Sequence, residues 1–324
     1  MSEVVHLDVH LYRHRHSARD IPTIPNTITD ARRFLMAKPY IKRLIIAEGA
    51  FVSDTEAAKT KRLVKYGFSL LDSRLLFGVT SSLLKRPELA KQLALAQAAK
   101  TPRVQHKIAL LEALDQLKST IKFDFDIEHI PDHEVAALQA SDKQEIELRK
   151  KIQNSAHKLA TAPGWEELTD MMASTLTIAG RMIRRRNQAY AEIICGYLAN
   201  AYQQKKSAAV FVPVGGAHIM IPEHIRRSLP EDMPQPQFSE TIQEGRFFDS
   251  IERSYQNQVE LNDEFYDRDL ARQALAENLY ANFLMNREGL LFTDALQPAT
   301  LAICEKRSVP ELLNVLGSVT PIRS

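Results

Sequence analysis

Short apolar runs followed by helix-forming stretches constrain this chain most. Residues 44–47, Leu-Ile-Ile-Ala, are continuously apolar and lead directly into Glu48 and Gly49. Such a run is typical of a buried strand in a parallel sheet. The tetrapeptide at 53–56, Ser-Asp-Thr-Glu, is a capping box and predicts a helix that runs toward Tyr66. Because a helix that follows a buried strand is the repeating unit of α/β proteins, the sequence predicts that fold class.

Three more segments are expected to be strands. Residues 4–11 and 121–127 alternate between apolar and polar side chains, whereas residues 208–214 form an apolar run. The polar side of the first segment continues into His14 and His16. A strand that stays extended would therefore deliver both imidazoles to the side or the end of the sheet that is not core.

The remaining chain is expected to be mostly helical. Helical spacing covers residues 68–119, 132–205, 242–285 and 308–317, and four prolines fall between residues 222 and 236. We expect an α/β core domain over residues 1–230, in which helical insertions interrupt a mixed central sheet flanked by helices. Residues 231–324 are expected to form a helical C-terminal region packed on that core.

Composition excludes several classes of function. The 324 residues contain 42 Lys and Arg against 40 Asp and Glu, a net charge of +2 that gives no reason to expect nucleic acid or an anionic membrane as the partner. Cys195 and Cys304 lack the paired spacing of a zinc ribbon or a redox pair. No apolar run reaches the length of about 18 residues that a membrane span needs, and the first residues do not resemble a signal peptide. We expect a cytoplasmic protein, although non-classical secretion leaves no mark that these rules detect.

Two chemically capable residues follow expected strands. Gly215-Gly-Ala-His218 comes directly after the apolar run at 208–214, and Glu48 has the same placement after residues 44–47. Glycines allow a sharp turn close to a ligand, and histidine is a base or a metal ligand near neutral pH. The plainer interpretations are a glycine turn with a capping histidine and an acid bonded to a helix N-terminus.

A polar pair also interrupts the apolar stripe of the helix expected around residues 178–200. Helical spacing places Arg186 and Asn187 among Ile183, Tyr190 and Ile194 on that stripe. Polar groups on a core-facing stripe need partners. For the arginine these are expected to be a carboxylate, among Glu48, Asp124 and Asp126, or a substrate anion or carbonyl.

These segments resemble the superfamily of TraB, Tiki, ChaN and erythromycin-esterase-like proteins. Its members share a first strand ending in Gly-x-x-His, a strand-end glutamate, an Arg-Asn or Arg-Asp helix and a second Gly-x-x-His strand, in the order found here. Gly215-Gly-Ala-His218 matches the second histidine motif, and Arg186-Asn187-Gln-Ala-Tyr190 resembles the helix motif. The first motif would align with Arg13-His-Arg-His16, where arginine replaces the glycine of the family.

The resemblance implies hydrolysis of an ester or peptide bond in a small-molecule or peptide substrate. His16 or His218, together with Glu48, would activate water, and Arg186 and Asn187 would stabilise the oxyanion. The activation would be direct or through a divalent ion such as Mn, Co, Zn or Fe. The expected metal ligands are His16, Glu48 and His218, with Asp126 as a weaker one.

Two other functions remain open from the sequence. Leu11-Tyr-Arg13-His14 resembles the strand-end Arg-His of histidine phosphatases, which would make His14 a phosphorylated nucleophile. The missing glycine of the first motif instead favours an inactive scaffold that acts as an effector or binding protein. Apolar stripes on the expected helices are typical of core or of contacts between copies of the chain, so a homo-oligomer is also open. Whether Asp124, Asp126, His129 and His133 belong to the site is not decided by the sequence.

Overall fold

The computed structural model describes residues 5–14, 18–38, 40, 42–49, 51–66, 102–155, 162–243, 250–288 and 292–304. The chain divides into two compact units. Unit 1 comprises Met1–Ala136 and Arg186–Glu244, and unit 2 comprises Ala137–Arg185 and Gly245–Ser324. Each unit is therefore built from two separate stretches of chain. This division differs from the expected one because residues 137–185 group with the C-terminal stretch.

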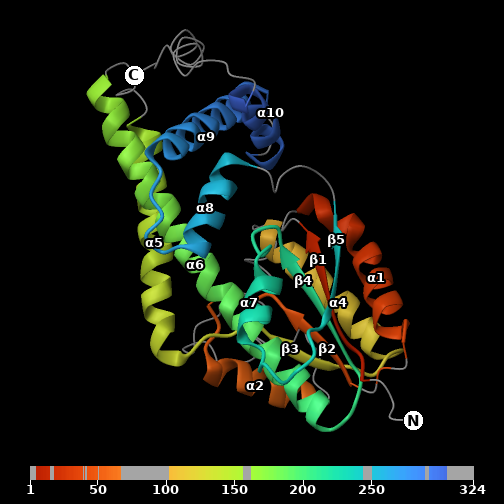
Figure 1. The fold of residues 1–324 in the computed structure, drawn as a ribbon. Helices are drawn as coiled ribbons and strands as arrows, with labels where there is room; N and C mark the ends of the chain where they lie inside the picture. Colours follow the sequence, from red (N-terminus) through yellow and green to blue (C-terminus); the bar gives the residue numbers. More distant parts are fainter. Residues whose placement is uncertain are drawn as a thin grey trace. The chain divides into compact units, whose positions relative to one another are not determined.

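Unit 1 is built on a five-stranded sheet (Figure 1). The strand order is β3-β2-β4-β1-β5. All pairings are parallel, where a mixed sheet was expected. The prediction of an α/β fold with a helix-flanked sheet is confirmed. The strands are β1 (Leu7–His14), β2 (Lys42–Ala47), β3 (Asp124–Ile127), β4 (Ala208–Gly215) and β5 (Gln237–Ile242).

Helices cover both faces of this sheet. Apolar residues of α1 (Ile24–Met36), α2 (Asp54–Lys65) and α4 (Pro102–Lys118) pack with Tyr12 and Phe211 on one face. On the other face, the part of α6 (Ala162–Gln203) that belongs to unit 1 and α7 (Ile221–Ser228) pack with the alternate strand residues. The capping box predicted at the start of α2 is present, since Ser53 Oγ accepts from Glu56 N and Glu56 accepts from Ser53 N.

The polar side of β1 is buried, so of the two expected placements the solvated side is wrong for the described part of the strand, whereas His14 does lie at the end of the sheet. All residues of β1 are buried, including His10 and His14. The reason is that a parallel sheet between two helix layers has no solvated face. Its polar side chains are accommodated by partners: Asp8 accepts hydrogen bonds from Tyr40 and from Lys38, the latter at 2.8 Å. His16 lies outside the described residues.

Strand β5 is the one described strand that the sequence did not predict. Its residues, Gln-Phe-Ser-Glu-Thr-Ile, are mostly exposed and contain no apolar run. It nevertheless pairs with β1, with Phe238 opposite Val9. A strand at the edge of a sheet needs few apolar residues because it is covered less completely. Of the expected helices, residues 68–101 and 308–317 lie outside the described part of the chain.

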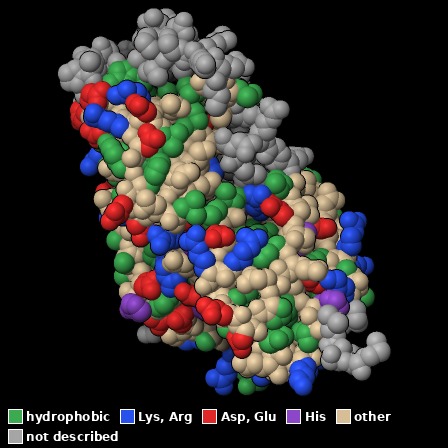
Figure 2. All heavy atoms as spheres, viewed as in Figure 1, with side chains coloured by type: hydrophobic (Ala, Val, Ile, Leu, Met, Phe, Trp, Pro, Cys, Tyr) green, Lys and Arg blue, Asp and Glu red, His purple; other side chains and the backbone are tan. Residues whose placement is uncertain are grey.

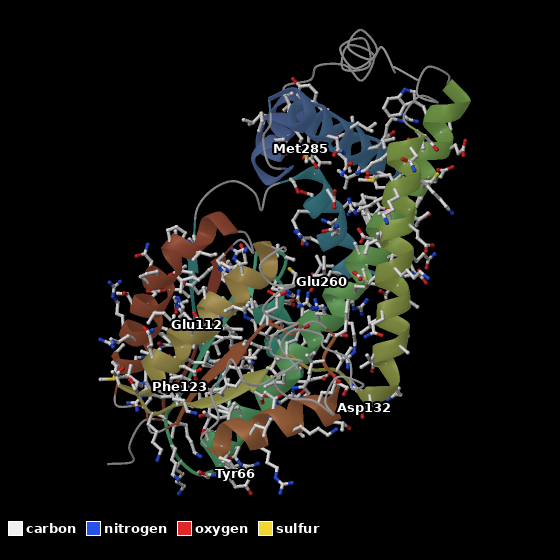
Figure 3. The ribbon with its side chains drawn as sticks, turned by 180° about the vertical axis from the view of Figure 1, so that it is seen from behind. Tyr66, Glu112, Phe123, Asp132, Glu260 and Met285 are labelled. Atoms are coloured by element: carbon white, nitrogen blue, oxygen red, sulfur yellow. The ribbon has the colours of Figure 1, made fainter. Side chains whose placement is uncertain are left out.

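The described part of unit 2 is helical, as expected for the C-terminal region. Its helices are α8 (Ile251–Leu261), α9 (Arg268–Glu288) and α10 (Phe292–Cys304), with parts of α5 (Asp132–Asn154) and α6. Leu168, Tyr255 and Leu275 belong to its main apolar cluster. Figure 3 marks the buried Glu260 on α8 and Met285 on α9, which packs against a second, smaller cluster.

Charged side chains of both signs occur close together on the viewed face in Figure 2, which agrees with the small net charge. Among the helices described, none combines the length and the hydropathy that crossing a membrane would require.

Candidate functional site

The carboxyl ends of four neighbouring strands in unit 1 place polar side chains at one end of the sheet. His14 is the last residue of β1, Glu48 and Glu128 directly follow β2 and β3, and His218 comes three residues after Gly215, the last residue of β4. All four of these side chains are buried. Because parallel strands end on the same side, segments far apart in sequence meet here, at the position where α/β proteins bind ligands.

A guanidinium group joins two of the strand ends. Arg186 of α6 donates from Nε and Nη2 to the two carboxylate oxygens of Glu128, at 2.5 Å each. Nη2 also donates to Glu48 Oε1 at 2.9 Å. Burial by itself would lower the pKa of Arg186, but the charges of Glu128 and Glu48 outweigh it and raise the pKa well above its ordinary value. Arg186 is therefore a fixed positive charge between two buried carboxylates.

Gly49 allows the two glutamates to lie side by side. A Cβ atom at this position would lie 2.1 Å from the backbone oxygen of Glu128, closer than any non-bonded contact permits. The same segment supplies a third acceptor to Arg186, since Gly49 O accepts from Nη2 at 3.0 Å. The glycine after β2 is thus required by close packing of two strand ends.

Asn187, the next residue of α6, forms a hydrogen bond with His218. Asn187 Oδ1 and His218 Nδ1 lie 2.6 Å apart, and His218 N donates to Gly215 O at 3.1 Å. An amide oxygen can only accept, so Nδ1 carries a proton, and in the neutral imidazole the lone pair is then on Nε2. In this tautomer His218 can act as a base through Nε2.

Tyr190 lies near both His218 and the two glutamates that bind Arg186. Its ring lies edge-on to the ring of His218, with centroids 5.3 Å apart. Burial, followed by the charges of Glu128 and Glu48, raises the pKa of Tyr190 well above its ordinary value. The phenol therefore stays protonated and can donate a hydrogen bond. We call Glu48, Glu128, Arg186, Asn187, Tyr190 and His218 the strand-end cluster.

Two members of the site region are absent from the sequence prediction. Glu128 follows β3 as Glu48 follows β2, so the strand-end position was a signal that could have found it. His106 of α4 packs its ring against His14, with centroids 4.7 Å apart. His106 belongs to a helical segment that contains no recognisable motif. Its contact with His14 could therefore be found only from the structure.

Other candidates have different partners. Asp126 binds Lys61 Nζ at 2.6 Å and accepts from Ile127 N, and Asp124 accepts from Tyr197 Oη at 3.1 Å. The ring nitrogen Nδ1 of His129 lies 2.7 Å from Ile127 O, and His133 is exposed. Arg13 pairs with Glu240 of β5. Of the three carboxylates considered for Arg186, only Glu48 forms the described ion pair, and Glu128 supplies the second.

Of the expected metal ligands, Glu48, His218 and the weaker Asp126 lie among the described residues, and the two carboxylates have cationic partners. Glu48 is ion-paired with Arg186, which places a positive charge beside the carboxylate that a divalent ion would have to bind, and Asp126 is ion-paired with Lys61. Within the described ranges, no group of three or more His, Cys, Asp or Glu residues is arranged to hold a metal ion. His16, the other expected ligand, lies outside those ranges.

The strand-end cluster combines a base of fixed tautomer, a fixed cation, two carboxylates and a protonated phenol within one buried region. These are the components of proton transfer and of oxyanion stabilisation. Comparison of the chain with models of protein families, with curated proteins and with solved structures gives no match.

Proposed function

We propose that the protein is a hydrolase that cleaves an ester or amide bond with water activated by His218. The observation that carries the proposal is the contact between Asn187 Oδ1 and His218 Nδ1, which directs the lone pair of the imidazole to Nε2. A buried histidine held in one tautomer by a neighbouring side chain is the arrangement of a general base.

In the proposed step, Nε2 of His218 takes a proton from water while the water oxygen attacks the acyl carbon. The oxyanion that forms is stabilised by the positive charge of Arg186 and by the hydroxyl of Tyr190. The bond to the leaving group then breaks, and His218 returns its proton to the leaving oxygen or nitrogen. Glu48 and Glu128 hold Arg186 in position, and no metal ion takes part.

One contact favours this reaction over phosphomonoester hydrolysis through His14. A histidine phosphatase would use Arg13 to bind the phosphate, but the guanidinium of Arg13 pairs with Glu240. We therefore rank the ester or amide substrate first.

The test is turnover of ester, peptide and phosphomonoester panels by the wild type, His218→Ala and His133→Ala. We expect wild-type turnover of esters or amides, unchanged by a chelator and lowered about 10²–10⁴-fold in His218→Ala. His133 is an exposed histidine outside the cluster, so His133→Ala should keep full activity.

Equal turnover in the wild type and a folded His218→Ala variant would contradict the proposal. Turnover of phosphomonoesters alone, abolished by His14→Ala, would replace it with the phosphatase. An inert wild type across all panels would leave the non-catalytic effector as the better interpretation.

A further inference from the structure

A second polar cluster lies in unit 1, away from the strand ends, where β1 and β5 meet α1. Ser239 Oγ of β5 lies 2.8 Å from Nδ1 of His10, and Nε2 of His10 lies 2.8 Å from Oδ2 of Asp30. Ser239 is exposed, His10 is buried and Asp30 is partly buried. The order serine, histidine, aspartate and the hydrogen-bond distances match the relation between a nucleophile, its base and the group that orients the base, with the two ring nitrogens exchanged relative to the usual triad.

The fold fixes each member of this cluster. His10 and Ser239 are direct partners in the parallel pairing of β1 with β5, so their side chains share one face of the sheet. Asp30 comes from α1, which covers that face. The imidazole stacks on Phe211 at 5.4 Å between ring centroids and contacts Phe34 at 5.1 Å, which leaves its ring little freedom.

The hydrogen bonds define which nitrogen of His10 is the base. The carboxylate of Asp30 can only accept, so Nε2 carries the proton and Nδ1 carries the lone pair that accepts from Ser239. Asp30 Oδ2 also accepts from Thr241 Oγ at 2.8 Å, which fixes the carboxylate. Burial lowers the pKa of His10 more than Asp30 raises it, so the imidazole is neutral at neutral pH.

A backbone donor lies next to the serine. Gln243 N donates to Arg13 O across the β5–β1 pairing at 2.8 Å. In a parallel strand, the backbone N–H groups of alternate residues point to the same side. The N–H groups of Ser239 and Thr241 therefore point toward β1, like that of Gln243. The N–H of Glu240 then points to the other side, where β5 has no neighbour among the described strands. That position, directly after the nucleophile, is where serine hydrolases place an oxyanion donor.

We propose that Ser239, His10 and Asp30 form a second acyl-transfer site, which reacts with small activated esters that reach the exposed edge of the sheet. Ser239 Oγ bonds to the acyl carbon while its proton passes to Nδ1 of His10. The C–O bond of the ester breaks, and the proton passes from His10 to the leaving alkoxide. Water hydrolyses the acyl-serine in a second step, with His10 again accepting the proton.

The test is covalent labelling with a fluorophosphonate probe, followed by intact mass and peptide mapping. We expect one adduct per chain, located at Ser239. The adduct should disappear in Ser239→Ala and form at least about tenfold more slowly in Asp30→Asn, in which the base loses its orienting carboxylate. Ser141→Ala is the matched control, because Ser141 is a serine on α5 whose hydroxyl donates only to a backbone oxygen at 3.1 Å.

Thermal unfolding of each variant shows whether it is folded, and Ser239→Ala, at an exposed position, is expected to keep the wild-type melting temperature. No adduct at Ser239 in the folded wild type would overturn the proposal. An adduct that forms at the wild-type rate in folded Asp30→Asn would overturn it as well. Because mapping locates the adduct by residue, the result does not depend on hydrolysis at His218.

Discussion

In the strand-end cluster, the two polar residues of α6 contact other side chains of the cluster, and these contacts indicate their roles. Asn187 is placed to act on His218 rather than on a substrate, since the contact between its Oδ1 and the imidazole Nδ1 sets the tautomer. The sequence prediction had assigned Asn187 to the oxyanion. Arg186 likewise has Glu48 and Glu128 as partners before any substrate. The sequence therefore identified Arg186 and Asn187 as candidate functional residues, but the role of each follows from its contacts in the folded chain.

Asn187→Ala is expected to lower turnover at least about tenfold, because the imidazole loses the acceptor that fixes its tautomer and orientation. Asn187→Asp should restore most of it, because a carboxylate also accepts from Nδ1. The aspartate would raise the pKa of His218, which must be deprotonated to act as a base, and would therefore move the acidic limb of the kcat/KM profile to higher pH. Steady-state kinetics over a pH series checks both effects. A purely structural role for Asn187 would give equal losses in both variants and no shift.

His10 makes the fold sensitive to mild acid. Burial lowers its pKa despite the opposing charge of Asp30, whereas the unfolded chain binds a proton there at the ordinary pKa of about 6.5. Below that pH the unfolded state binds more protons than the folded state. The contribution of His10 to the free energy of unfolding is thus complete above pH 6.5 and decreases as pH falls.

Urea denaturation of the wild type and His10→Gln at pH values above and below about 6.5 measures this effect. We expect the wild type to lose more stability on acidification than the variant does. Parallel pH dependences would show that His10 keeps an ordinary pKa in the folded protein.

The elements of the sheet differ in how well the sequence predicts them. Strands β1, β2, β3 and β4 were expected because apolar runs or alternation mark segments that are buried between helix layers. Strand β5 was missed because four of its six residues are exposed and none is buried, so no apolar pattern is required of it. For the same reason Ser239 and Glu240 carried no signal. Their partners, His10 and Arg13, are more than 200 residues away in sequence.

Two glycines of unit 1 give a matched test of the packing at the strand ends. In Gly49→Ala the new Cβ would meet Glu128 O at 2.1 Å, whereas in Gly196→Ala it would meet nothing within 4 Å. We expect Gly49→Ala to destabilise the fold by about 1–3 kcal/mol. Gly196→Ala, in the interior of α6, should stabilise it by about 0.5–1 kcal/mol.

Chemical denaturation measures both variants. Gly49→Ala should also reduce turnover, because the clash separates the backbone segments that carry Glu48 and Glu128. A Gly49→Ala protein of wild-type stability and activity would mean that the two strand ends are not packed as described.

At the scale of the whole chain, each unit has an apolar core of its own. Phe211 is fully buried in the core of unit 1, and Leu275 is fully buried in that of unit 2. Phe211→Ala is expected to cost about 3–5 kcal/mol and Leu275→Ala about 2–5 kcal/mol. Hydrogen exchange with mass analysis should place the loss of protection in the sheet for the first variant and in α8 and α9 for the second. Equal loss of protection throughout the chain in both variants would contradict two separate cores.

The order of the strands in the sheet also bears on how the chain is made. Strand β1 is synthesised before the other described strands, and both of its neighbours, β4 and β5, begin about 200 residues later. At about 5–20 residues per second, the first strand leaves the ribosome roughly 10–40 s before a neighbour is available. During that time Val9 and Leu11 have no sheet to join. The segment that forms β1 therefore stays without a sheet partner until β4 emerges, and exposed apolar surface of this kind is prone to aggregation.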